Sequence, residues 1–232
     1  MFTPTLEDVD RYRRLRAASR ALNEKLVNTI PHEAYEDIGT ALGIMRNGVL
    51  VFDNEAESSV MADCCLFEWY ENGENLVQRY AKAHHANLSV DERYLLDAFQ
   101  RAEYRILSAQ SVVRGAGLRF RDVLTEEDLF VMDTAMSHGE DARGAVLATR
   151  TIPLGEYWMT GGAGVPVQPS KEFSAALKRI KENPPELAEY GFGLLVVRAA
   201  LDCGAADDVR YAGASAPPRK RRIAPKHQWR RR

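Results

Sequence analysis

Cysteine is scarce in this 232-residue chain, which contains only Cys64, Cys65 and Cys203. Three thiols cannot build a disulfide framework, and the absence of any Cys-x-x-Cys spacing argues against a structural zinc site. The chain also lacks an apolar run of about 18 residues and a cationic start leading into an apolar segment, so we expect no transmembrane helix and no secretory leader. Together these absences predict a cytoplasmic protein in a reducing compartment.

Motifs that mark common enzyme classes are missing as well. Neither Gly-x-Ser-x-Gly, His-Glu-x-x-His nor the kinase set is present. The glycine-rich run at 161–164 is not completed to a phosphate loop, so we predict a flexible exit from a strand there. His84 and His85 point about 100° apart on a helix, which favours surface histidines over a shared metal. We therefore expect no cofactor and no metal.

Asp122 and Asp133 are the remaining candidates for acid–base chemistry. They follow neighbouring predicted strands, and a pair of converging carboxylates would suit a hydrolase. Aspartates beside turns more often accept hydrogen bonds from their own backbone, which favours a structural role. We therefore favour a protein without enzymatic activity and keep a hydrolase as the least favoured alternative.

The first part of the chain has helical periodicity. With 45% hydrophobic residues, the chain can bury the core of one compact domain or two small ones. Apolar spacing predicts a helix over 6–27 with Thr5 as its N-cap, and a shorter helix over 32–42 closed by Gly43. A Ser-x-x-Glu capping box at Ser89 predicts the start of another helix.

Other features of this region bear on packing and binding. An Asn-Gly turn followed by four apolar residues predicts one buried strand at 49–52. Cys64 and Cys65 fall at apolar positions of a helical pattern, which predicts packed thiols rather than a redox pair. Five arginines of the first helix lie opposite its apolar stripe, and we interpret them as a solvated face rather than a polyanion site. They are Arg11, Arg13, Arg14, Arg16 and Arg20.

From Tyr104 to Val167 the apolar period shortens from about 3.6 residues to 2. The predicted strands cover residues 105–113, 118–124, 129–132, 145–152 and 157–160. Five short strands with such close turns predict a small antiparallel β-barrel or curled sheet, because closure protects edges that would otherwise be exposed. Beyond it, Ser170 is expected to cap one helix and the prolines at 184–185 to open another, with Gly191 and Gly193 in its interior.

The predicted fold class is α+β. The expected organisation is a mainly helical region at 1–103, a small β-domain at 104–167, C-terminal helices at 168–204 and a basic flexible tail at 205–232. Composition after Gly213 cannot bury a core, which predicts disorder of the isolated tail.

Charge is distributed unevenly along the chain. Of its 31 lysines and arginines, eight lie in the last 14 residues, where no acidic residue occurs. Residues 1–218 therefore contain 23 basic and 33 acidic residues, a net charge of −10. The protein combines an acidic body with a basic tail.

The tail supplies the candidate nucleic-acid-binding residues. Cations suited to phosphates alternate there with an aromatic residue that can stack on an unpaired base, a combination that favours RNA over duplex DNA. The candidates are Arg219, Lys220, Arg221, Arg222, Lys226, His227, Trp229, Arg230, Arg231 and Arg232. An acidic protein partner, an anionic membrane and screening of the acidic body are the alternatives.

Several segments resemble a group of uncharacterised bacterial proteins, over about residues 40–167. They are Asp91-Glu92-Arg93, Ala102-Glu103-Tyr104-Arg105, the run at 117–127, Val131-Met132-Asp133 and the run at 158–162. Members of that group often end in the zinc-binding motif also found at the SecA C-terminus. Here no cysteine follows Cys203, so zinc is not expected, and the resemblance implies no catalytic residues.

We therefore predict a non-enzymatic RNA-associated or ribosome-associated accessory protein, whose tail supplies affinity while its body supplies recognition. The main alternative is a protein-interaction adaptor that binds a partner through exposed edges of the β-domain.

Overall fold

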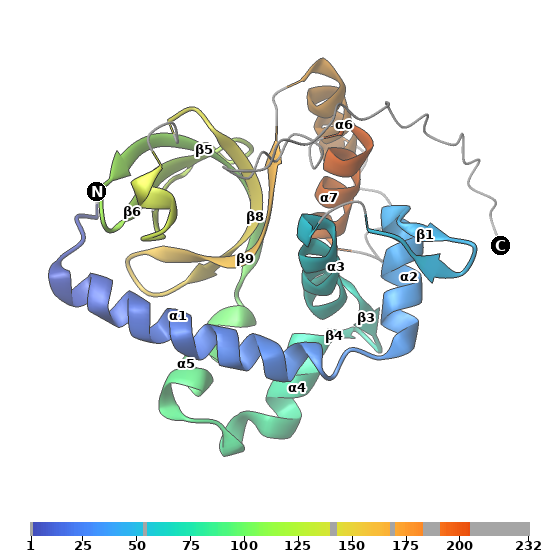
Figure 1. The fold of residues 1–232 in the computed structure, drawn as a ribbon, viewed down its shortest axis with the longest axis horizontal. Helices are drawn as coiled ribbons and strands as arrows, with labels where there is room; N and C mark the ends of the chain where they lie inside the picture. The colour runs from blue at the N-terminus through green and yellow to red at the C-terminus, as the bar shows by residue number, and fades with distance from the viewer. Residues whose placement is uncertain (1, 53–54, 140–142, 168–169, 183–190, 205–232) are drawn as a thin grey trace.

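The computed structural model describes residues 2–52, 55–139, 143–167, 170–182 and 191–204. Figure 1 shows a β-barrel on one side, a group of helices on the other, and a long N-terminal helix that runs alongside both. This architecture confirms the predicted α+β class. The predicted basic tail lies outside the described residues.

Most of the predicted elements are present. Within the described residues the helices are α1 (Leu6–Val27), α2 (His32–Leu42), α3 (Glu55–Glu68), α4 (Leu76–His84), α5 (Val90–Phe99), α6 (Lys171–Glu182) and α7 (Phe192–Asp202). The strands are β1 (Met45–Arg46), β2 (Val49–Leu50), β3 (Tyr70–Glu71), β4 (Glu74–Asn75), β5 (Glu103–Val113), β6 (Gly117–Asp122), β7 (Asp128–Met132), β8 (Val146–Pro153) and β9 (Trp158–Val167).

Local capping determines where the predicted helices begin and end. The Thr5 side chain accepts a hydrogen bond from the Asp8 backbone N–H at 3.2 Å, and the Asp8 carboxylate accepts one from the Thr5 N–H. Ser89 starts α5 with a reciprocal capping box of the same kind. Gly43 ends α2 in the left-handed conformation, at φ 72°. All three predictions are confirmed.

Strands β5 to β9 close into a barrel with the order β5-β6-β7-β9-β8. Each strand pairs with two neighbours, and all pairs are antiparallel except β7 with β9. That parallel junction contains only two residue pairs, Val131 with Trp158 and Met132 with Met159. The barrel was predicted, but the prediction of a purely antiparallel sheet was wrong at this junction.

Strand β9 is longer than predicted, because it continues through the glycine-rich run at 161–164. Gly164 pairs with Thr149 of β8, and a Cβ at Gly164 would lie 3.0 Å from Leu147 Cδ1. The flexible exit predicted here was therefore wrong. These glycines let β9 approach β8 closely, whereas the apolar pattern ends earlier and predicts a shorter strand.

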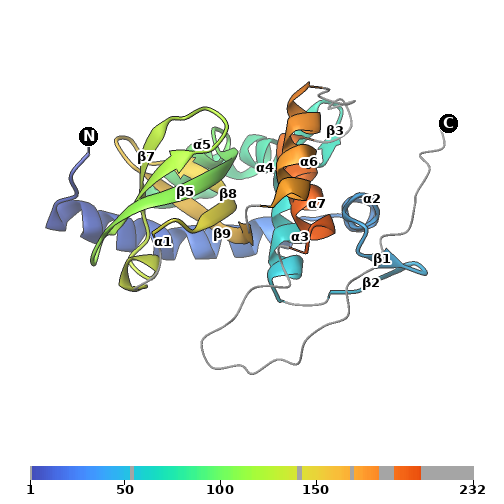
Figure 2. The same ribbon diagram turned by 90° about the horizontal axis from the view of Figure 1, so that it is seen from above.

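Three apolar clusters hold the fold together. The barrel interior contains a compact set around Leu107, Phe120 and Val131. A second cluster joins the outer barrel surface to α1, α4 and α5, and a third joins it to α2, α3 and α7. The third cluster therefore contains residues from helices before the barrel and from a helix after it. Figure 2 shows α3, α6 and α7 side by side against the barrel.

A buried ion network joins the barrel to α3. Arg150 of β8 donates to both Asp63 carboxylate oxygens at 2.9–3.1 Å and to Glu68 Oε1 at 2.5 Å. Its guanidinium also lies 4.1 Å from the centroid of the Phe67 ring. Two carboxylates and one guanidinium leave an excess negative charge in a buried site, and burial raises the pKa of Asp63 although Arg150 opposes this.

The start of α7 closes this network from its other side. Gly191 is the N-cap of α7 rather than an interior helical residue, which corrects the predicted position of this glycine. A methyl group at Gly191 or Gly193 would overlap the Glu68 carboxylate. Glycine is thus required where the chain passes the carboxylate, and the N-terminal end of the helix dipole stabilises that negative charge.

Two further predictions have opposite outcomes. Cys64 and Cys65 are buried, and burial raises the pKa of Cys65 to about 12, which confirms packed and unreactive thiols. The buried strand predicted at 49–52 was wrong: β2 pairs with β1 in a short hairpin where Val49 is 62% exposed. Only Leu50 and Val51 of the run are half-buried, and Leu50 packs against the apolar cluster of α2, α3 and α7, while Val49 and Phe52 remain exposed.

Replacing Arg150 with methionine tests the ion network. The variant leaves Asp63 and Glu68 without their buried cation, which is expected to cost about 3–5 kcal/mol in the free energy of unfolding. Loss of the opposing cation raises the pKa of Asp63 further. When the carboxyl pKa is higher in the folded than in the unfolded state, protonation favours folding at low pH. This contribution is lost as the pH rises through the folded-state pKa. The loss relative to wild type should therefore be smaller near about pH 5 than near about pH 8 in urea unfolding.

The matched control is Arg13→Met, which removes an exposed ion pair with Asp10. It should change the unfolding free energy by less than about 0.5 kcal/mol at either pH. An Arg150→Met effect as small as this control would contradict a structural role for the network.

Candidate functional site

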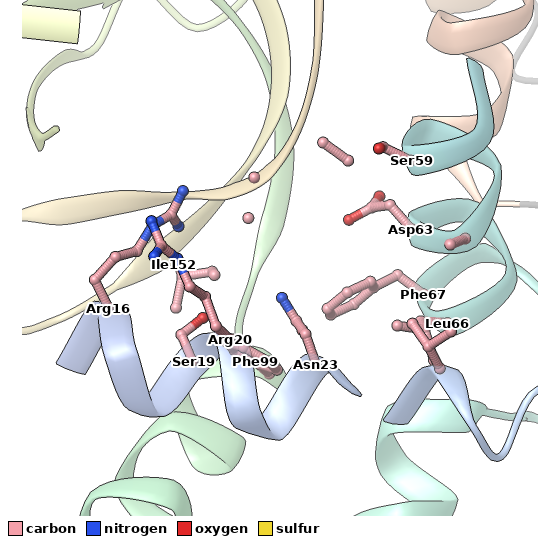
Figure 3. A pocket seen from close by; sticks show the side chains of 15 residues that line it. Arg16, Ser19, Arg20, Asn23, Ser59, Asp63, Leu66, Phe67, Phe99 and Ile152 are labelled. Atoms are coloured by element: carbon pink, nitrogen blue, oxygen red, sulfur yellow. The ribbon is translucent and has the colours of Figure 1, made fainter. Parts of the chain in front are cut away.

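A cleft of about 440 Å³ lies where α1, α3 and β9 meet, and we call it the α1–α3 cleft. Its lining comprises Arg16, Ser19, Arg20, Asn23 and Val27 from α1, Ser59, Ala62, Asp63, Leu66 and Phe67 from α3, Phe99 from α5, and Ile152, Gly161, Gly162 and Ala163 from the barrel. Figure 3 shows the side chains of α1 and α3 facing each other across the gap. This volume is typical of small-molecule sites.

Helical spacing explains the polar wall formed by α1. Ser19 and Arg20 follow Arg16 by three and four residues, and Asn23 follows them by four and three, so the four residues lie on one side of the helix. Arg16 Nη1 donates to the Thr160 carbonyl of β9 at 2.5 Å, which fixes this face against the barrel. The wall is thus positioned by a backbone acceptor of the barrel rather than by a carboxylate.

The arginines of α1 have different roles. Arg13 and Arg14 form surface ion pairs with Asp10 and Asp91, as expected for a solvated face. Arg11 instead donates to the Leu154 carbonyl at 3.2 Å, and Arg16 also contacts the barrel. Interpreting all five arginines as a solvated face was therefore wrong for these two, because the barrel lies against the side of the helix that they occupy.

Two arginines line the α1 side of the cleft. Among the described residues neither Arg16 nor Arg20 forms an ion pair with a carboxylate. The carboxylate that lines the cleft, Asp63, is bound by Arg150.

A second feature is an aromatic slot on the outer face of the barrel, defined by Phe130, Tyr157 and Arg119. The Phe2 ring occupies it, with centroids 5.3 Å from Phe130 and 5.5 Å from Tyr157. Arg119 lies over the Phe130 ring at 5.7 Å and donates to the Phe2 carbonyl at 3.3 Å. The slot therefore holds a planar ring and a carbonyl acceptor at the same time.

Asp122 and Asp133, the candidates for acid–base chemistry, accept hydrogen bonds from nearby backbone. Asp122 Oδ1 accepts from the backbone N–H groups of Leu124 and Thr125, and Asp133 Oδ1 accepts from that of Met136. These contacts confirm turn chemistry and give no support to a carboxylate pair.

No metal site is formed by the candidate histidines. His84 is exposed, and His85 pairs with Asp97 on the surface. No cluster of potential metal ligands occurs within the described part of the chain. The ten tail residues predicted to bind nucleic acid lie outside the described residues, so that prediction is untested.

Sequence patterns could not single out the aromatic slot or the charged cleft. Phe2, Arg119 and Phe130 are far apart in the chain and meet only because β6 pairs with β7 beside the N-terminal segment. Arg20 belongs to a helix with several arginines, and the sequence does not show which of them line the cleft, because that depends on tertiary packing. Neither set forms a motif of fixed spacing.

The roles of Arg16 and Arg20 can be distinguished by their effects on the free energy of unfolding. Arg16→Met removes a charged hydrogen bond to the Thr160 carbonyl and should lower the free energy of unfolding by about 1.5 kcal/mol. Arg20→Met, an exposed change without a lost ion pair, should stay within about 0.5 kcal/mol. Urea unfolding of both variants measures the difference, and equal losses would show that Arg16 does not anchor α1 to the barrel.

Comparison with known proteins gives a family but no function. A model of a family of unknown function (DUF7986) matches residues 6–183, which include the barrel and the residues lining the cleft. No curated protein and no solved structure matches the chain. No helix among the described residues combines the length and apolar character that a membrane span requires. Because the match covers most of its length, the chain belongs to this family of unknown function.

Proposed function

We propose that the protein is a non-enzymatic, cytoplasmic RNA-associated accessory protein. In this proposal the aromatic slot holds an unpaired base, and the basic tail holds phosphates along the strand. Ribosomal RNA is one source of such strands. The observation that carries the proposal is the Phe2 ring lying against Phe130 and Tyr157 while Arg119 binds its carbonyl.

Phe2 places a ring in the slot, tilted 50° from Phe130 and 36° from Tyr157, and its backbone carbonyl accepts from Arg119. A nucleobase is a planar ring, and most bases carry an exocyclic carbonyl that accepts hydrogen bonds. Sequence-tolerant RNA binding uses this combination of an aromatic face and a guanidinium donor. The proposal therefore treats Phe2 as an internal occupant that an unpaired base displaces.

The barrel topology supports the same function by analogy. Five strands in the order β5-β6-β7-β9-β8, with the third and fifth parallel, form the arrangement of the OB-fold. Barrels of that class bind oligonucleotides or oligosaccharides on the face of their second and third strands. Arg119 and Phe130 lie on the corresponding strands, β6 and β7. A shared fold does not carry a function by itself, so this argument is secondary to the slot.

Charge explains why the tail is needed. The acidic body, with a net charge of −10 over residues 1–218, repels a polyanion at long range. Eight cations in the last 14 residues provide an opposing local charge. In the proposal, the tail overcomes the repulsion and the slot adds contacts to bases.

A protein-interaction adaptor is the second candidate, and one observation favours it. The β1–β2 hairpin presents Val49 and Phe52 to solvent, at 62% and 39% exposure. Addition of a partner strand to the barrel has less support, because every barrel strand already pairs with two neighbours. An adaptor would therefore use the hairpin rather than the barrel edge.

Removing the tail tests its contribution. If all eight tail cations contact phosphates of a single-stranded RNA, log K should fall with log salt concentration with a slope of about −6. A chain ending at Pro217 should show a much flatter slope. Fluorescence anisotropy with an unstructured RNA over a salt series measures both slopes. Equal and weak binding by the two proteins would eliminate the tail as an RNA element.

Substitutions in the slot test base recognition. Phe130→Ala should weaken binding of a short unstructured RNA by about fivefold or more, since stacking contributes about 1–3 kcal/mol per base. Phe2→Ala should strengthen binding, because it removes the internal competitor. Leu6→Ala is the control, since Leu6 is 86% exposed and should have no effect. Unchanged affinity in both slot variants would refute the slot as the RNA site.

A further inference from the structure

The α1–α3 cleft is separate from the aromatic slot, and its chemistry differs. The slot is formed by one cation and two aromatic rings and is filled by the Phe2 ring, whereas the cleft is lined by two arginines together with other polar and apolar residues. We propose that this cleft binds a mononucleotide or a similar ring-bearing phosphate ester, with the phosphate between Arg16 and Arg20. This site does not depend on the proposed RNA function.

The positions of the two arginines suit a phosphate group. Residues four apart on a helix have Cβ atoms about 5–6 Å apart, so both guanidinium groups can reach one anion. A guanidinium offers paired N–H donors that match phosphate oxygens, and it carries its charge at every physiological pH. Arg16 keeps one of its donors on the Thr160 carbonyl and has further N–H groups for a ligand.

The acidic residue of the cleft is itself held by a guanidinium. Asp63 accepts three contacts from Arg150 at 2.9–3.1 Å, and Arg150 also binds Glu68, so the phosphate is placed at Arg16 and Arg20 on α1 rather than beside α3. Hydrogen-bonding groups that remain around the cleft are those of Ser19, Asn23 and Ser59. They suit the hydroxyl groups and ring nitrogens of a nucleoside better than they suit a bare anion.

The remaining wall is apolar and aromatic. Phe67 and Leu66 of α3 and Ile152 of β8 line the cleft, and Figure 3 shows the Phe67 ring extending from α3 toward the gap. A planar ring bound in the cleft would find an apolar surface at these side chains and an amide at Asn23. The cleft volume of about 440 Å³ lies within the usual range for ligands of this size.

The glycine strand completes the site. Gly162 has φ +97°, and a Cβ there would point toward Arg16, 3.6 Å from Nη2. A side chain at this position would occupy the space beside the guanidinium that the phosphate needs. The glycine-rich run thus keeps the barrel side of the cleft open as well as allowing close packing with β8.

Calorimetric titration of the full-length protein tests the proposal, with adenosine monophosphate, inorganic phosphate and adenosine as probes. The monophosphate should bind at least tenfold more tightly than either of the other two. Arg20→Glu should weaken monophosphate binding at least tenfold, and Arg20→Gln should weaken it less. Arg13→Glu, on the same helix but 62% exposed and away from the cleft, should change it less than twofold.

Three results would overturn the proposal. They are no monophosphate binding at millimolar concentration, equal losses in Arg13→Glu and Arg20→Glu, and phosphate binding as tight as monophosphate binding, which would mean that the ring is not recognised. Arg119→Met, which removes the guanidinium of the slot and does not touch the cleft lining, separates this site from the RNA proposal. It should leave monophosphate affinity unchanged, and a parallel loss of affinity would mean that the cleft is not an independent site.

Discussion

The pairing of Arg150 with Asp63 and Glu68 is the interaction on which the arrangement of the molecule depends. It joins a barrel strand to α3 at a buried position, where an unpaired charge would be too costly to retain. Glu68 in turn lies at the start of α7, where two glycines leave room for its carboxylate. One guanidinium thus joins the barrel to α3 and, through Glu68, to the start of α7.

Helix α1 adds the second constraint. It is long enough to lie along both the barrel and α3, and it is fixed to the barrel by arginine hydrogen bonds to the Leu154 and Thr160 carbonyls. Apolar residues on its inner face join the cluster that also contains Phe130 and Tyr157. The same helix therefore places Phe2 over the aromatic slot at one end and the cleft arginines beside α3 further along.

Features set by neighbouring residues could be predicted from the sequence. The N-caps at Thr5 and Ser89 and the C-cap at Gly43 depend on contacts within one turn, and the five barrel strands follow from apolar alternation. The parallel junction of β7 with β9 could not be predicted, because alternation fixes which face a residue takes but not which strand lies beside it. The glycine-rich part of β9 has too few side chains to show any period. The hairpin of β1 and β2 shows the opposite case, in which an apolar run is buried only in part, at Leu50 and Val51.

The candidate sites were harder to predict because they depend on contacts between residues that are distant in the chain. Asp122 and Asp133 were correctly expected to serve turns, because those hydrogen bonds are local. The slot and the cleft combine residues more than 100 positions apart, such as Phe2 with Phe130 and Arg16 with Gly162, and no spacing rule connects them.

The central claim is that RNA contacts the folded body at the slot as well as the tail. Photo-crosslinking of the full-length protein to a single-stranded RNA containing 4-thiouridine, followed by mass spectrometry of the peptides, tests it directly. The account predicts cross-links at Phe130 or Tyr157 in addition to the tail. Cross-links confined to residues 205–232, or none at all, would contradict it.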